Sequence, residues 1–133
     1  MKSIKISIPS MIENIKIIES FIDNAKEKFD INDDIYGNIM ISVTECVSNA
    51  IIHGNQNKGN KKVDLELKFL ENQLQFIIED EGDGFDFDDL NDPTAPENLE
   101  NPGGRGIFII KHLCDEVSFE NEGKRIVLTF YMN

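Results

Sequence analysis

Apolar and polar residues alternate in five segments of the chain, which is the pattern of a strand with one buried face. In the first segment, Ile4, Ile6 and Ile8 alternate with polar residues up to Pro9. The other four segments span 63–69, 74–78, 117–119 and 126–130. Short polar turns at 71–73 and 121–123 separate neighbouring segments. We therefore predict five β-strands, each with one side against a core.

Apolar residues at spacings of three and four predict helices elsewhere. The first helix follows Ser10 and Glu13, which match a capping box. Its apolar face consists of Ile15, Ile18, Ile22, Ala25 and Phe29. The second helix begins at Asn32, a favourable N-cap, and is predicted to end at Gly54. A shorter apolar run, 107–113, predicts a third helix behind a glycine-rich segment.

These elements occur in an order that indicates one α+β domain over residues 1–133. Strands lie at both ends and in the middle, so we predict a two-layer sandwich with a mostly antiparallel mixed sheet and helices on one face. Residues 86–102 show no periodicity and contain three of the chain's four prolines. A long irregular segment inside a compact domain is typical of a lid or a binding loop.

Charge and composition narrow the possible partners. The formal net charge is −12, which argues against a nucleic-acid surface and against binding to an anionic membrane. A protein partner with a basic patch is compatible with it. Cys46 and Cys114 lack metal-ligand spacing, which is consistent with reduced thiols in the cytosol. No segment matches a signal peptide or approaches the length needed to cross a bilayer, so we expect a soluble, cytoplasmic protein.

One face of the second helix carries the first candidate for chemistry. Ser42, Glu45, Asn49 and His53 are spaced three, four and four apart, so they share that face. A carboxylate one turn before a carboxamide has no evident structural benefit. Taken alone, the pattern favours a solvated helix face, and His53 at the helix end is read as a packing or capping residue.

Two glycine-rich segments supply the other candidates. Asp80 follows a strand and is followed by Gly82 and Gly84, so its carboxylate can accept a hydrogen bond from an exocyclic amino group such as that of adenine. Taken alone, the segment favours a tight turn rich in Asp and Gly, which is common. Residues 103–106, Gly-Gly-Arg-Gly, open the third helix, where unpaired backbone N–H groups and Arg105 suit a phosphate. The alternative is a plain helix entry or hinge.

The ordered combination of these segments resembles a known superfamily. Glu-x-x-x-Asn with a following His-Gly, then Asp-x-Gly-x-Gly after a strand, then a long loop, then Gly-x-Gly before a helix, is the sequence of boxes in the histidine kinase-like (GHKL) ATPases. The amino-acid sequence of residues 45–54 and the small size of the chain are most similar to those of bacterial anti-sigma factor serine/threonine kinases of stress response and sporulation. The resemblance extends over essentially the whole chain.

The resemblance implies a role for each matching residue. Glu45 would be the general base for γ-phosphoryl transfer to a serine, and Asn49 would ligate Mg²⁺ beside ATP. Asp80 would recognise adenine, with residues 86–102 as the ATP lid. The remaining implied nucleotide contacts are Gly82, Gly84, Gly104, Arg105, Gly106 and, through water, Thr129.

The resemblance further implies an anti-sigma factor that binds an RNA polymerase sigma factor and phosphorylates a serine of an anti-anti-sigma (STAS-type) partner, as a homodimer. The segment between Phe85 and Gly104 departs from the pattern, because it contains acidic residues and no Lys or Arg. A nucleotide-binding module that sequesters sigma without kinase activity therefore stays open. A detached histidine kinase catalytic domain is a third reading, although the chain shows no phospho-acceptor helix pair.

Overall fold

The computed structural model describes residues 2–82 and 109–132 of the 133-residue chain. Its sheet has five strands in the order β1-β2-β3-β5-β4, and every neighbouring pair is antiparallel. The strands are β1 (Lys2–Pro9), β2 (Lys62–Leu70), β3 (Gln73–Glu79), β4 (Glu116–Glu120) and β5 (Arg125–Tyr131). All five predicted strands are present, which confirms the α+β prediction.

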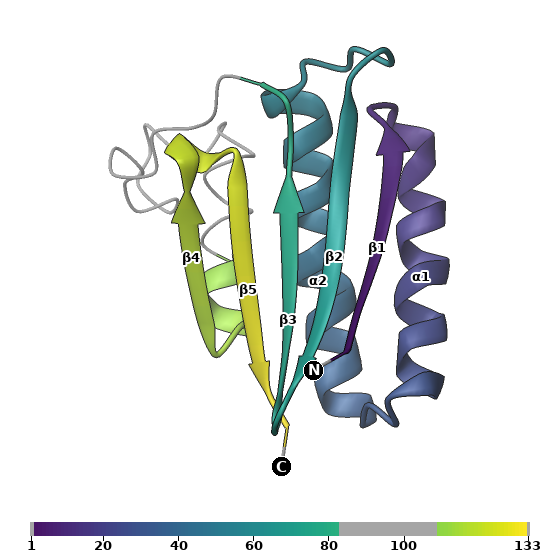
Figure 1. Cartoon of the computed structure of the whole chain (residues 1–133), viewed down its shortest axis with the longest axis vertical. Helices are drawn as coiled ribbons and strands as arrows, with labels where there is room; N and C mark the ends of the chain where they lie inside the picture. The colour runs from purple at the N-terminus through teal and green to yellow at the C-terminus, as the bar shows by residue number, and fades with distance from the viewer. Residues whose placement is uncertain (1, 83–108, 133) are drawn as a thin grey trace.

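The helices lie on one side of this sheet (Figure 1). A short 3₁₀ turn, η1 (Ile12–Asn14), leads into α1 (Ile15–Lys28). Helix α2 (Asp33–Asn49) follows and continues into a π-helical turn, η2 (Ala50–Gly54). Residues 109–113 form a further helical turn before β4, and a 3₁₀ turn, η5 (Asn121–Gly123), joins β4 to β5.

The predicted helix starts are half right. Asn32 caps α2, because its Oδ1 accepts a hydrogen bond from the Ile35 N–H at 3.0 Å. The capping box predicted at Ser10 and Glu13 is wrong, since α1 begins later, at Ile15, and its N-cap side chain makes no capping bond. Ser10 is instead buried at the end of β1, where its N–H donates to the Lys61 carbonyl.

The hydrophobic core fills the space between the helices and the inward face of the sheet. Every second residue of the strands points into it, as the alternation predicted. Its fully buried large side chains are Phe76, Phe130, Ile8, Ile18, Ile22, Ile39, Ile51, Leu65, Leu67, Leu74, Ile78 and Ile110. The edge-to-face contact of Phe76 with Phe130, at 6.0 Å between ring centroids, joins β3 to β5 within this core.

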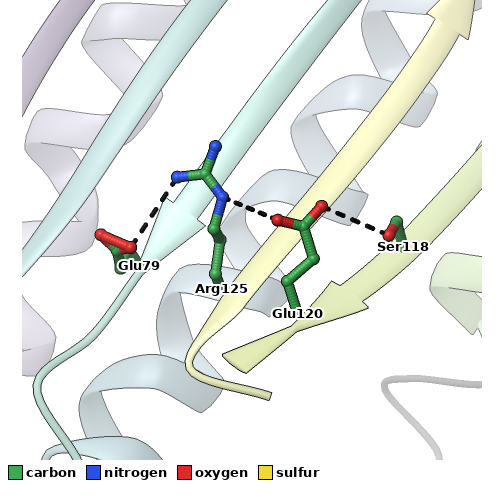
Figure 2. A network of polar contacts seen from close by, with 4 residues as sticks. All are labelled: Glu79, Ser118, Glu120 and Arg125. Atoms are coloured by element: carbon green, nitrogen blue, oxygen red, sulfur yellow. Dashed lines mark hydrogen bonds and ion pairs between the residues drawn. The ribbon is translucent and has the colours of Figure 1, made fainter. Parts of the chain in front are cut away.

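The opposite face of the sheet is polar. Figure 2 shows Arg125 on β5 between Glu79 of β3 and Glu120 of β4. Arg125 Nε lies 3.0 Å from Glu120 Oε1, and Nη1 lies 3.7 Å from Glu79 Oε2. Such exposed pairs contribute little to stability, about 0–1 kcal/mol each. Their value here is that they show which side of β5 is outward.

In the described part of the chain, one helical stretch meets the length and composition of a membrane span, which corrects the expectation from sequence. It is Asp33–Gly54, 22 residues long, because η2 continues α2 without a break. Ile39, Val43 and Val47 on this stretch are fully buried against the sheet. The apolar composition therefore belongs to a core helix.

Candidate functional site

Helix α2 presents the first two candidate residues at the end of its length. Glu45 is half-buried and lies one turn before Asn49, which is only 5% exposed. The packing of Val43, Cys46 and Val47 into the core fixes the rotation of the helix. The two polar side chains are therefore held on a rigid element, the last turn of α2.

The end of this helix meets the segment that leaves β3. Gly54 closes the π-helical turn η2, and a Cβ atom placed on it would lie 2.5 Å from Asp80 Oδ2. A Cβ atom on Gly82 would lie 1.6 Å from the Gly54 carbonyl oxygen. Only glycines allow this approach, so the two predicted boxes meet at one contact. We call this contact of Gly54, Asp80 and Gly82 the joint. π-helical turns are often found at functional sites.

Hydrogen bonds orient Asp80 within this joint. Its N–H donates to the Lys124 carbonyl at 2.9 Å, which ties it to the start of β5. Its Oδ1 accepts the Gly82 N–H at 2.8 Å. Asp80 as a whole is 7% exposed, so it is largely buried at the end of the sheet.

Burial raises the pKa of both candidate carboxyl groups. The pKa of Glu45 is raised by desolvation, and an attraction to His53 partly opposes this. The pKa of Asp80 is raised by desolvation, and the Gly82 N–H bond and nearby lysines partly oppose this. A base with a raised pKa holds an abstracted proton better, which suits the role expected of Glu45.

Asn55 joins the same region and was missed by the sequence analysis, which placed it in a polar loop. It is fully buried. Its Oδ1 accepts the Glu81 N–H at 2.8 Å, and its Nδ2 donates to the Lys62 carbonyl at 3.0 Å. The available signal was its position directly after the predicted helix end, where a buried Asn commonly bonds to the backbone.

Asn49 has the properties expected of a ligand residue. Among the described residues, its Nδ2 has no hydrogen-bond partner although the atom is buried. An unpaired buried amide is costly unless another group completes its bonding. The carboxamide oxygen is a ligand type that Mg²⁺ accepts together with phosphate oxygens and water. The unpaired Nδ2 is a donor and fits an acceptor such as a phosphate oxygen, whereas Oδ1 is the atom of Asn49 that fits Mg²⁺.

Thr129 lies apart from this group. It is on β5 beside Gln75, whose Nε2 donates to the Thr129 hydroxyl at 3.4 Å. Ile126, Leu128 and Phe130 face the core, so Thr129 points to the other side of the sheet from the helices. The structure does not bring Thr129 together with Asp80.

Of the remaining candidates, the structure describes Ser42 and His53 but not the residues of the predicted lid and glycine-rich segment. Ser42 is buried on α2, and among the described residues its hydroxyl has no hydrogen-bond partner. His53 is exposed on η2, at the end of the helix. Gly84, Gly104, Arg105, Gly106 and the predicted lid 86–102 lie outside the described residues.

The fold and this joint define a class of protein. A family model for the histidine kinase-like ATPase domain matches residues 8–130, nearly the whole chain, and the chain belongs to this family. The resemblance seen in the sequence is thereby confirmed.

Individual relatives align with almost the whole of this chain and with most of their own length. The serine-protein kinase RsbW of Bacillus subtilis (strain 168) is 29% identical over 137 residues, covering 98% of this chain and 86% of that protein. The proteins of the same name from Bacillus velezensis and from Staphylococcus aureus (strain MRSA252) are each 28% identical, again covering 86% of the relative.

Proposed function

We propose that this chain is an ATP- and Mg²⁺-dependent protein serine/threonine kinase that acts as an anti-sigma factor. It binds an RNA polymerase sigma factor, and it phosphorylates a serine of an anti-anti-sigma (STAS-type) partner. The observation that carries the proposal is the joint of Gly54, Asp80 and Gly82. It lies at the end of the helical stretch whose preceding turns carry Glu45 and Asn49. The serine-protein kinase relatives support the choice of reaction.

The proposed reaction assigns one role to each of these groups. Glu45 accepts the proton of the serine hydroxyl as its oxygen attacks the γ-phosphorus of ATP. The bond between the γ-phosphorus and the bridging oxygen breaks, and ADP carries away the electron pair. Asp80 would accept a hydrogen bond from the adenine amino group, and Asn49 would hold the metal–triphosphate end. Mg²⁺, when bound, supplies positive charge that offsets the charge of the triphosphate.

Nucleotide binding is the first prediction to test. Calorimetric titration of the purified protein with ATP is expected to show binding that strengthens when Mg²⁺ is present. Asn49→Ala is expected to lose most of the magnesium effect, because it removes the carboxamide oxygen. Absence of ATP binding by the parent protein would refute the proposed function.

Glu45 tests the catalytic assignment separately. Glu45→Gln and Glu45→Ala are expected to reduce phosphoryl transfer to a STAS-type partner by about 10²- to 10⁴-fold, the usual contribution of a general base. Their ATP affinity, measured by the same titration, should stay close to that of the parent. Transfer at the parent rate by either variant would show that Glu45 is not the base.

A sigma-sequestering module without kinase activity is the second candidate. The acidic residues of the predicted lid favour it, because like charge disfavours contact with a triphosphate. Under this alternative, the parent protein binds sigma and ATP but leaves the serine of the partner unmodified. Mass spectrometry of the partner after incubation with ATP distinguishes the two functions.

Location and assembly follow from the proposed partners. A protein that binds RNA polymerase sigma factors works in the cytoplasm, and we expect a soluble protein that contacts neither nucleic acid nor membrane directly. We also propose a homodimer. Analytical ultracentrifugation with and without ATP tests this assembly, and a single species at the monomer mass of 15.1 kDa would contradict it.

A further inference from the structure

Asn55 is the residue whose contacts extend furthest beyond the assigned site. It follows η2 directly and is fully buried, yet it belongs to none of the boxes that carry the resemblance. Both polar atoms of its side chain are bonded to backbone groups of other segments. A buried Asn with this bonding fixes the relative position of the segments it joins.

The orientation of the carboxamide is determined by its partners. The Glu81 N–H can only donate and the Lys62 carbonyl can only accept, so Oδ1 must face Glu81 and Nδ2 must face Lys62. The backbone of Asn55 is held as well, since its N–H donates to the Ala50 carbonyl at 2.8 Å. The side chain is therefore fixed to η2 at one end and to two strand ends at the other.

These contacts connect Asn55 to Asp80 by two routes, one through Gly54 and one through Glu81. Gly54, the preceding residue, touches the Asp80 carboxylate, and Glu81, the residue after Asp80, donates to Asn55. A further bond closes the arrangement, because the Lys62 N–H donates to the Glu81 carboxylate. Loss of the Asn55 side chain would leave the Glu81 N–H and the Lys62 carbonyl without these partners and loosen the segment on the helix side, while the Asp80 N–H stays bonded to the Lys124 carbonyl.

We propose that Asn55 is a positioning residue for adenine recognition, acting through Asp80. The inference rests on the proposed function, because it requires Asp80 to accept a hydrogen bond from the exocyclic amino group of ATP. It assigns to Asn55 the distance between helix end and strand end on which that hydrogen bond depends. Asn55 itself is not assigned a contact with the nucleotide.

The test compares ATP with ITP, which carries a carbonyl oxygen in place of the adenine amino group. The parent protein should bind ATP more tightly than ITP. Asn55→Ala should weaken ATP binding about tenfold, the effect of losing a well-placed hydrogen bond, and weaken ITP binding much less. The preference for ATP is the critical readout, because a variant that is only less stable keeps the preference in its folded molecules.

Two further variants complete the design. Asn55→Asp keeps an acceptor for the Glu81 N–H and loses the donor to Lys62, so it should be intermediate and covers the case in which Asn55→Ala does not fold. Asn60→Ala is the matched control, since Asn60 is an exposed residue of the same loop and should bind both nucleotides like the parent.

The outcomes separate this inference from the function on which it rests. An unchanged ATP-to-ITP preference in folded Asn55→Ala and Asn55→Asp would overturn the role of Asn55 while leaving the ATP site intact. Failure of the parent protein to bind ATP would overturn both. A collapsed preference in the Asn55 variants, with Asn60→Ala unchanged, would establish the role.

Discussion

At the scale of single residues, the site combines carboxyl groups that are costly to bury with glycines that make the burial possible. Glu45 and Asp80 both have a raised pKa because they are partly removed from water. A protein selected only for stability would avoid this cost. The residues that reduce stability here are those to which the proposed reaction assigns a role.

The raised pKa of Asp80 has a predictable effect on stability. Folding favours its protonated form, so its stabilising contribution is fully present below the usual pKa of 3.8 and is lost as pH rises through the raised folded-state value. Asp80→Asn, which does not titrate, should therefore gain stability relative to the parent as pH increases. Denaturant unfolding of both proteins between about pH 4 and about pH 8 measures this difference.

The same variant should lose nucleotide affinity. A hydrogen bond to a charged acceptor contributes more than a neutral one, so ATP binding is expected to weaken roughly 10- to 100-fold. Higher stability at neutral pH together with weaker binding would show that the carboxylate is kept for function. Asp80→Asn that is less stable than the parent at every pH would contradict the account of its burial.

At the scale of elements, the end of α2 decides how the helix and the sheet meet. The π-helical turn η2 brings Gly54 against Asp80, and the first two boxes become one joint. The sequence predicted that the helix would end at Gly54, and this is confirmed. The π-helical form of the last turn was not predicted, because the spacing of apolar residues does not distinguish a single π-helical turn from an α-helical one.

Two glycines of the same helical stretch provide a matched pair of substitutions. Gly54→Ala must displace the Asp80 carboxylate and should destabilise the protein by about 1–3 kcal/mol, the typical cost of overpacking. Gly37→Ala is the control, since a Cβ atom there meets nothing within 4 Å. It should stabilise α2 by about 0.5–1 kcal/mol because alanine is the better helix former. Thermal unfolding of both variants tests the pair, and equal effects would contradict the close contact at Gly54.

At the scale of the whole molecule, the fold separates two functions of the sheet. Its inward face packs against the core. The candidate site lies where the end of β3 meets the end of the α2 and η2 helical stretch. Its outward face carries polar residues such as those around Arg125 (Figure 2). The net charge of −12 adds self-repulsion to this arrangement, which opposes the compact state.

This charge predicts the response to salt. Because ions screen repulsion between surface charges, the melting temperature at neutral pH should rise between about 50 mM and about 500 mM sodium chloride. Binding to a partner with a basic surface should weaken over the same range, because the same screening reduces attraction. A melting temperature that falls with added salt would show that local ion pairs outweigh the net charge.

The amino-acid sequence by itself determined the strands, the helices, the inward-facing residues and the order of the boxes. These depend on local periodicity, which each segment carries within itself. The alternation of Ile126, Leu128 and Phe130 also predicts that Thr129 points away from the core. The family resemblance had instead implied a nucleotide contact for Thr129.

Only the tertiary structure decided which distant segments touch. It brought Gly54 against Asp80, placed Asn55 between Lys62 and Glu81, and left the Ser10 capping box unformed. Periodicity specifies which side of an element is buried, but not which atoms of two distant elements meet. Those contacts depend on strand register and on where each helix ends, and both are set when the core packs as a whole.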